Sequence, residues 1–308
     1  MIAERMGRHD WLEWRRGGIG GSDAAAVAGL SPFGNPWTVW ADKRGLTPLE
    51  GPENRGRRAG RLLEPVILDW FEEDSGLEVL DRQAMVVHQD HDWMRATLDG
   101  HAYQDVEGGG PGVTPSWPEC VGVVEAKASN GLDGRWKDGV PEYIVIQAQH
   151  QMAVDGAARA YVAVLLRGDS FLWFQLERDE GAIAMLMEIE ERFWRRHVLG
   201  GVAPDVDASD QTAQALRAAY ARPAVEEKEL PTVALELIAD YLRASMAAVA
   251  AKAERQKAAN RLMTLMGYAE VGTVEGRPVV RWPLIQRRGY TVKPTEYRKL
   301  TVIGGVEE

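Results

Sequence analysis

The chain has 308 residues, of which 45% are hydrophobic and 27% are charged, and its formal net charge is −10. This length and composition are typical of a globular protein with one large domain and appendages, or with two smaller domains. The negative charge argues against a protein that coats nucleic acid without specificity, because neutralising phosphates requires clustered Lys and Arg. Two segments are nevertheless locally basic, residues 55–61 and Arg277 to Lys299.

The sequence also limits the compartment and the kind of metal site. No apolar run reaches the roughly 18 residues of a membrane-spanning helix, and the first residues lack the apolar stretch of a secretory signal. We therefore expect a soluble protein of the cytoplasm. The single cysteine, Cys120, excludes an internal disulfide and a Cys-based zinc or iron–sulfur site. Any bound metal must then be held by oxygen or imidazole.

Hydrophobic spacing and turn residues predict helices at both ends of the chain and mostly strands between them. Ser22 is expected to cap a short helix that ends at Gly29, and Pro36 to begin a second helix that ends at Gly45. The next expected elements are a helix at 57–74, strands at 79–88, 94–106 and 121–128, a helix at 141–156, strands at 160–166 and 171–176, and a helix at 179–197. Beyond a linker-like region, residues 232–266 should form one long helix or a hairpin of helices, followed by a β-hairpin around Glu275 and Gly276.

Two carboxylates and a lysine stand out among the predicted strands. Glu125 and Lys127 are two residues apart and therefore share a strand face, and antiparallel pairing of the strands at 94–106 and 121–128 would bring Asp99 beside them. Charges among apolar neighbours are costly unless something compensates them, and a divalent cation such as Mg²⁺ would do so. Glu64, on the helix at 57–74, could complete the metal shell. An isolated Glu-x-Lys pattern is, however, typical of an ordinary ion pair on a solvated strand.

Several other side chains are candidates for contacts with a ligand. Gln147 and Gln151 are four residues apart and could share one helix face, with His150 between them. A lone histidine is more often structural than catalytic. Trp93, Trp117 and Trp136 fall in loop-like stretches, where a tryptophan could meet nucleic-acid bases.

The order of the motifs resembles the YqaJ viral recombinase family, which is similar to the lambda-exonuclease type of PD-(D/E)XK nuclease. The stretches that carry the resemblance are IGGSDAAAVAGLSPFGNPWTVWADKRG, GRLLEP, ATLDG, VEAK and QAQHQMAV. The resemblance implies an α/β fold with a restriction-endonuclease-like mixed β-sheet flanked by helices. It also implies a nuclease core of Glu64, Asp99, Glu125 and Lys127, with Asp99 and Glu125 as metal ligands and Gln147 beside them.

The resemblance also implies a function for the amino-terminal motif. Lambda exonuclease and similar enzymes hold the 5′-phosphate of a DNA end with an arginine and a serine near the start of the chain, and Arg15 and Ser22 stand in the matching positions. A guanidinium, a hydroxyl and backbone N–H groups together make an anion site. In the alternative interpretation, Ser22 only caps a helix and Arg15 packs along Trp11 or Trp14. Both interpretations can hold at once.

The function implied by the resemblance is a magnesium-dependent exonuclease, with Mn²⁺ as a substitute ion, that acts on double-stranded DNA ends in the 5′ to 3′ direction. The implied partners are a single-strand annealing protein and further copies of the chain in a trimeric ring, within a bacterial host or encoded by a phage. An endonuclease of the same fold, and a module that binds DNA ends without cutting, are the alternatives.

The expected organisation has three parts. Residues 1–205 form the nuclease core, residues 206–231 a linker, and residues 232–308 a helical carboxy-terminal appendage with a β-hairpin and a basic tail.

Overall fold

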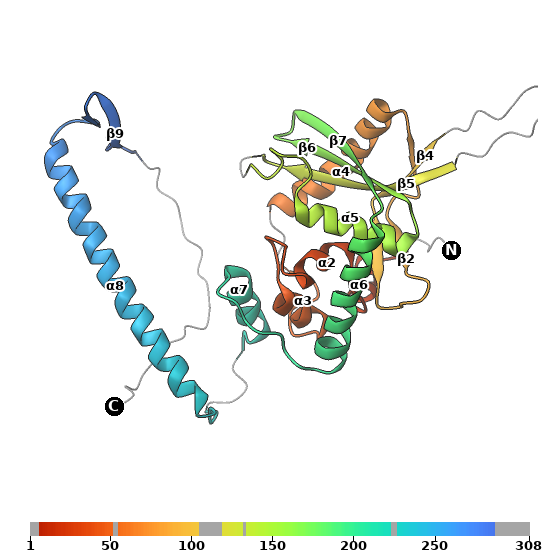
Figure 1. Cartoon of the computed structure of the whole chain (residues 1–308), viewed down its shortest axis with the longest axis horizontal. Coiled ribbons are helices and arrows are strands. Elements are labelled where there is room, and N and C mark those ends of the chain that lie inside the picture. Colours follow the sequence, from red (N-terminus) through yellow and green to blue (C-terminus); the bar gives the residue numbers. More distant parts are fainter. Residues whose placement is uncertain (1–5, 52–54, 105–118, 132–133, 223–226, 287–308) are drawn as a thin grey trace, which may run out of the picture. The chain divides into compact units, whose positions relative to one another are not determined.

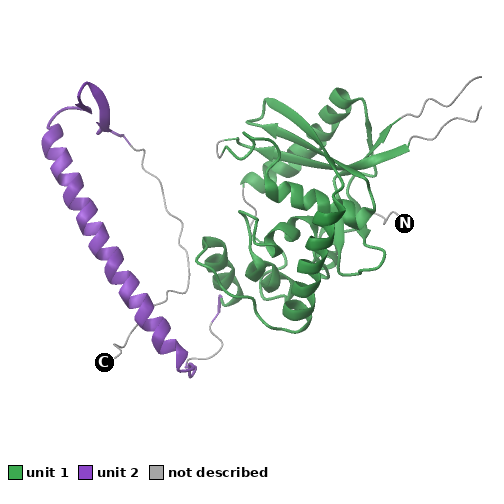
Figure 2. Ribbon diagram, viewed as in Figure 1, with its two compact units in different colours: residues 1–220 green, residues 221–308 purple. Residues whose placement is uncertain are grey.

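The chain divides into two compact units, Met1–Tyr220 and Ala221–Glu308 (Figure 2). The computed structural model describes residues 6–51, 55–104, 119–131, 134–222 and 227–286. Unit 1 contains all the residues predicted for the site. The fold class predicted from the sequence is confirmed, because unit 1 is built on a mixed sheet flanked by helices and a helical carboxy-terminal part follows it.

The main sheet of unit 1 has five strands in the order β1-β4-β5-β6-β7 (Figure 1). These strands are β1 (Glu78–Leu80), β4 (Gly100–Gln104), β5 (Glu119–Ser129), β6 (Arg159–Leu166) and β7 (Ser170–Glu177). The central strand β5 runs antiparallel to β4 and parallel to β6. The parallel connection from β5 to β6 passes through helix α5 (Glu142–Asp155), as parallel pairing requires a crossover.

Both faces of the sheet are covered by helices, which explains why β6 is almost entirely apolar. On one face, Tyr161, Ala163 and Leu165 pack with helix α4 (Arg55–Ser75). On the other face, Val162 and Val164 pack with Ile144 of α5. Alternate residues of one strand therefore build two separate parts of the core.

The remaining elements of unit 1 surround the α5 side of the sheet. They are α1 (Arg8–Arg16), α2 (Gly21–Val27), α3 (Pro36–Lys43), the ribbon of β2 (Ala84–Val87) and β3 (Arg95–Leu98), α6 (Glu180–Phe193) with its π-helical extension Trp194–Leu199, and α7 (Asp210–Ala219). Helix α2 packs on α5, and α3 packs on α7. Asn35 caps α3 through its contact with Thr38 N and also donates to Thr212 of α7 at 2.6 Å.

The structure differs from the sequence expectation in three places. The predicted strands 79–88 and 94–106 are each divided in two, because Asp81 and Gln83 adopt positive φ angles and because the chain bends at Asp99 to pass from the ribbon into the main sheet. The expected linker at 206–231 contains helix α7, which belongs to unit 1. The expected cap of α2 is also different, as described below.

The described residues of unit 2, 221–222 and 227–286, form one long helix and a hairpin. Helix α8 (Val233–Met266) contains no buried residue, and β8 (Val271–Val274) pairs with β9 (Arg277–Arg281). The predicted turn is present, with positive φ at Glu275 and Gly276, as a tight hairpin connection requires. The predicted basic tail lies mostly beyond residue 286 and therefore outside the described residues. None of the helices described is long and apolar enough to cross a membrane.

Candidate active site

The central strand β5 carries two of the predicted catalytic side chains, Glu125 and Lys127. Both reach toward α5, as expected for residues two apart on a strand. Nζ of Lys127 donates to Oε1 of Glu125 and, at 3.1 Å, to Oε1 of Gln147. The second oxygen of Glu125 accepts from Nε2 of Gln151 at 2.5 Å. Glu125 is only 4% exposed, so these two donors replace the water that its carboxylate loses on burial.

Asp99 lies at the bend between β3 and β4. Since Gly100 is the first residue of β4 to pair with β5, Asp99 is brought beside the next residues of that strand. Its Oδ2 accepts the backbone N–H of Ala126 at 2.8 Å. Burial, followed by the negative charges of Glu125 and Glu64, raises the pKa of Asp99 well above its usual range. The structure therefore brings Asp99 to the strand that holds Glu125.

Glu64 extends from α4 and accepts a hydrogen bond of 2.5 Å from Nε2 of Gln83. Burial and the charge of Glu125 raise the pKa of Glu64. Glu64 therefore interacts electrostatically with the same cluster of charges. The pKa of Lys127 is also raised, although burial acts on it in the opposite direction. Burial alone would lower it, but the charges of Glu125 and Asp99 outweigh burial and raise it. The amine of Lys127 is therefore a protonated hydrogen-bond donor.

The charges of this cluster bear on the predicted metal. Three carboxylates surround a single ammonium group, and a divalent cation would relieve the excess of negative charge. Across the described part of the chain, however, no group of three or more His, Cys, Asp or Glu side chains is gathered closely enough to hold a metal ion. The donor set therefore fits an ion held by one or two carboxylates with water and substrate oxygens, and it does not fit a closed protein cage.

Helix α5 supplies two glutamines, one turn apart, to the two side chains of β5. Gln147 was predicted for the site, whereas Gln151 had only its helical spacing to indicate it. Gln151 is 1% exposed, and within the described residues its Oε1 is buried without a hydrogen-bond partner. A Cβ atom at Gly21 of α2 would lie 3.1 Å from Cγ of Gln147 and 3.3 Å from Cγ of Gln151. Glycine at this position thus allows α2 to pack closely against the site.

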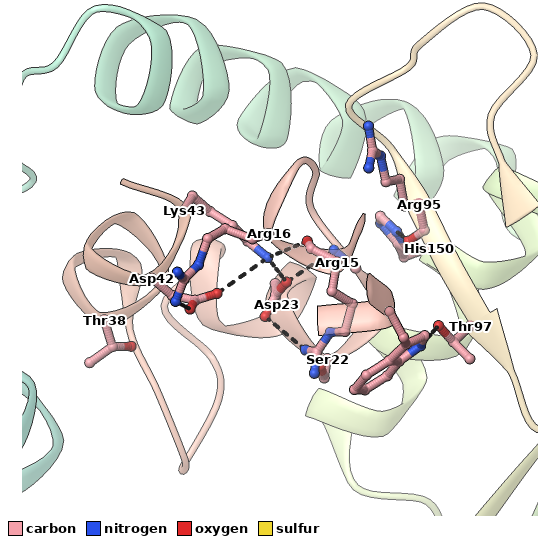
Figure 3. Close-up of polar contacts among 12 residues, drawn as sticks. Arg15, Arg16, Ser22, Asp23, Thr38, Asp42, Lys43, Arg95, Thr97 and His150 are labelled. Atoms are coloured by element: carbon pink, nitrogen blue, oxygen red, sulfur yellow. Dashed lines mark hydrogen bonds and ion pairs between the residues drawn. The ribbon is translucent and has the colours of Figure 1, made fainter. Parts of the chain in front are cut away.

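Arg15 and Ser22, the residues predicted to bind a terminal phosphate, are in contact (Figure 3). Nη2 of Arg15 donates to Oγ of Ser22 at 3.0 Å and to Oδ1 of Asp23 at 3.5 Å. The guanidinium also lies 5.4 Å from the centre of the Trp11 ring. Arg15 retains 34% of its side-chain exposure, so it packs on Trp11 and still faces solvent.

The cap of α2 corrects the prediction for Ser22. The helix begins at Gly21, and Gly20 is its N-cap, so Ser22 lies inside the first turn. Asp23 instead accepts the backbone N–H of Gly20 through Oδ2, at 3.1 Å. The hydroxyl of Ser22 is thereby available to Arg15.

A buried lysine supports this arrangement, and the sequence analysis missed it. Nζ of Lys43, on α3, donates to Oδ2 of Asp23 at 2.7 Å and to the carbonyl oxygen of Arg15 at 3.0 Å (Figure 3). Burial would raise the pKa of Asp23, but the charges of Lys43 and Arg15 outweigh it and lower the pKa to about 2. One feature of the sequence could have indicated it. Lys43 lies within the mostly apolar predicted helix PWTVWADK, and the sequence does not show which residue it pairs with.

Comparison with known proteins shows what these residues are similar to. Residues 10–158 match the model of the YqaJ-like viral recombinase domain. The protein YqaJ of Bacillus subtilis (strain 168), described as uncharacterised, is 29% identical over 305 residues, which cover 96% of this chain and 91% of YqaJ. All seven residues predicted for the site lie within the matched residues, which are called the YqaJ-like domain below.

Solved structures similar to the chain share little of its sequence. An alkaline exonuclease from Laribacter hongkongensis is 19% identical with a TM-score of 0.47, and the match covers 61% of this chain and 91% of the other. A putative exonuclease from Eubacterium rectale is 12% identical with a TM-score of 0.44, over 76% of this chain and 98% of the other.

A cavity of about 260 Å³ lies next to the YqaJ-like domain's candidate residues. Ser22 contributes to its wall from α2, and Lys127 and Gln147 contribute from β5 and α5. The aromatic ring of Phe33, from the loop between α2 and α3, is also part of the wall. One cavity is therefore lined by one of the two predicted phosphate-binding residues and by two of the predicted catalytic residues.

Three residues considered for ligand contact are structural instead. His150 is fully buried, with Nδ1 2.8 Å from Oε1 of Glu190 and Nε2 donating to the carbonyl oxygen of Arg95 at 3.0 Å. Trp93 and Trp136, expected in loops where they could meet bases, are each only 8% exposed and belong to the core. Trp117, for which the same contact was expected, lies outside the described residues.

Proposed function

We propose that this protein is a magnesium-dependent DNA exonuclease that removes mononucleotides from duplex ends in the 5′ to 3′ direction. The observation that carries the proposal is the meeting of Asp99, Glu125 and Lys127 at the central strand of a YqaJ-like domain. The match to the model of a viral recombinase domain supports DNA as the substrate. The direction of digestion rests on the family resemblance alone.

Asp99 and Glu125 are the residues that would hold Mg²⁺, or Mn²⁺ in its place, together with water and phosphate oxygens, and Glu64 would add negative charge close to the ion. When bound, such an ion lowers the pKa of a water molecule and stabilises charge on the attacked phosphate. Lys127, which is protonated, would orient the attacking water by donating a hydrogen bond. Gln147 holds the amine in place.

Replacement of Lys127 by alanine tests this assignment. Cleavage of linear duplex DNA should slow by about 10²- to 10⁴-fold, because a positioned group is lost from the reaction. Binding of DNA and of Mg²⁺ should change little, because neither depends on that amine. Asp99→Asn should abolish cleavage and weaken Mg²⁺ binding. Lys252→Ala, in unit 2, is the control and should cleave normally. Unreduced cleavage by Lys127→Ala would overturn the assignment.

Arg15 and Ser22 are proposed to hold the 5′-phosphate of the strand that is digested. A hydrogen bond from arginine to phosphate is charge-assisted, so a phosphorylated end should be digested roughly ten-fold faster than a hydroxyl end. Arg15→Ala should remove most of this preference. Arg8→Ala is a matched control, because Arg8 also lies over the Trp11 ring, 5.5 Å from its centre, but pairs with Glu50. Equal rates on both ends with the unmodified protein would contradict the assignment.

The two alternative functions are separated by the topology of the substrate. An exonuclease should digest linear duplex and leave closed circular duplex intact, whereas an endonuclease of the same fold should cut both. A module that only binds DNA ends should shift linear duplex in a binding assay and cut neither form, with or without Mg²⁺.

The assembly and the cellular role are part of the same proposal. We expect a closed trimeric ring, because a chain of net charge −10 binds DNA more readily if its few basic clusters line an enclosed channel. A strict monomer in light scattering at micromolar concentration, together with non-processive digestion, would refute the ring. The proposed setting is the cytoplasm of a bacterial host, where the exposed strand passes to a single-strand annealing protein.

A further inference from the structure

The loop between α2 and α3 carries an aromatic side chain that is not buried in the protein core. Phe33 is 66% exposed, although a phenylalanine gains most from full burial. Its ring meets Tyr143 of α5 edge to face, with centroids 5.5 Å apart and planes at 80°. The guanidinium carbon of Arg135 lies 5.0 Å from the centre of the same ring. Phe33, Tyr143 and Arg135 all contribute to the wall of the 260 Å³ cavity.

The backbone that carries Phe33 is held at both ends. The backbone N–H of Phe33 donates to Oγ of Ser31 at 3.1 Å. Two residues later, Asn35 caps α3 and donates to Asp207 and Thr212, both at 2.6 Å. A short segment fixed in this way keeps the exposed ring at one place relative to the cavity.

The cavity wall combines groups of different chemistry. Ser22, whose hydroxyl accepts from Arg15, and Lys127 with Gln147 supply polar groups. Phe33 supplies an apolar, polarisable surface on the same wall. The cavity volume falls below the roughly 300–1,000 Å³ of pockets that enclose drug-sized ligands, so it has room for one nucleoside and not for two.

We propose that Phe33 is the stacking platform for the base of the terminal nucleotide, whose sugar and phosphates reach from Ser22 to Lys127. The proposal rests on the proposed exonuclease function and deepens it by naming the residue that recognises the terminal nucleoside. Stacking on an aromatic ring suits a nuclease without sequence preference, because every base presents a π-face. The cation of Arg135 strengthens the platform by its attraction to the ring.

The test compares duplexes that differ only in their last base. One substrate has a normal 5′-phosphorylated terminal nucleotide, and the other has a reduced abasic sugar phosphate at that position. The full-length protein should cleave the normal end with a KM roughly ten-fold lower, as expected for the loss of one base stack. Phe33→Leu should bring the ratio of the two KM values close to one, and Phe33→Trp should restore it.

Trp70→Leu is the matched control. Trp70 is also an exposed aromatic residue, but it stacks on Phe171 over the α4 face of the sheet. This variant should keep the full preference for the normal end. A wild-type ratio of one, or a Phe33→Leu ratio equal to that of the wild type, would overturn the proposal.

A second measurement separates this inference from the proposed function. Calorimetry of the full-length protein with deoxyguanosine 5′-monophosphate and with deoxyribose 5-phosphate measures the contribution of the base without any cleavage. Wild-type protein should bind the nucleotide about ten-fold more tightly, and Phe33→Leu should bind both equally. If no duplex is cleaved, the exonuclease proposal fails, while the ratio of these two affinities still decides the role of Phe33.

Discussion

The ion pair between Lys43 and Asp23 fixes the position of Arg15. The side chain of Lys43 is only 1% exposed, and that of Asp23 is 15% exposed. Lys43 also holds the last turn of α1 through the carbonyl oxygen of Arg15, while Asp23 holds the start of α2 through Gly20. One buried charge pair therefore links three helices around the proposed phosphate-binding residue.

Lys43→Met should lower the free energy of unfolding by about 3–5 kcal/mol, because it leaves a mostly buried carboxylate without its main partner. Urea denaturation of the full-length protein measures this change. Asp23→Asn combined with Lys43→Met should cost less than the sum of the single changes, because neither charge then remains alone. Purely additive effects would show that the pair is not coupled.

The same pair predicts a dependence on pH. The folded pKa of Asp23 is about 2, below its usual 3.8. Its stabilising contribution is therefore fully present above about pH 4 and is lost as the pH falls toward 2. Wild-type unfolding free energy should drop in that window, and the drop should be smaller in Lys43→Met. Equal acid sensitivity of the two proteins would contradict the lowered pKa.

At the level of elements, the contact of α2 with α5 sets the geometry of the site. Gly21→Ala would place a methyl group against Gln147 and Gln151, the residues that hold Lys127 and Glu125. Overpacking and the better helix propensity of alanine oppose each other, so stability should change by no more than about 1 kcal/mol. Cleavage should nevertheless fall by more than about ten-fold. The added methyl group would shift the two glutamines, and a small shift of the groups that position Lys127 and Glu125 misplaces the reacting groups.

Gly60→Ala is the control for this substitution. A Cβ atom there, within α4, would have no heavy atom within 4 Å. It should raise the unfolding free energy by about 0.5–1 kcal/mol and leave cleavage unchanged. Normal cleavage by Gly21→Ala would show that the helix contact does not position the two glutamines.

Most elements were predictable because their signals are local. Spacing and end residues gave the helices α4, α5 and α8 and the strands β6 and β7 within a few residues of their observed limits. The division at Asp99 was not predictable, because the alternation of apolar and polar residues runs through it although its two halves belong to different sheets. The polar run at residues 81–83 does interrupt the other predicted strand, and positive φ angles at Asp81 and Gln83 divide it.

The candidate site was likewise predictable from the sequence only in part. Asp99, Glu125 and Lys127 were identified from strand spacing and motif order, and the structure places them together. Lys43 and Phe33 were missed, because their importance lies in contacts with residues far along the chain. A buried lysine and an exposed phenylalanine become informative only when their exposure is known.

For the whole molecule, the boundary between the units is the place to expect cleavage by a protease. Residues 227–231 are exposed and belong to no helix or strand, and they include Lys228. Brief trypsin treatment should cut first at Lys228 and release a fragment that unfolds at the same temperature as the intact chain, because unit 1 has its own core. Mass spectrometry identifies the cut. Initial cleavage after Lys127, within β5, would contradict this division.

The central position of β5 in the sheet also determines which part of the site stays folded when another part of the protein opens locally. This strand is paired on both sides, so its amide hydrogens should exchange with solvent only when the whole sheet comes apart. The backbone at Glu125 and Lys127 should therefore open only in the slowest opening motion of the protein. Ser22 and Phe33 lie on a seven-residue helix and the loop after it, which can open without the sheet. In a fluctuating molecule, the proposed catalytic half of the site would outlast the half proposed to receive the DNA end.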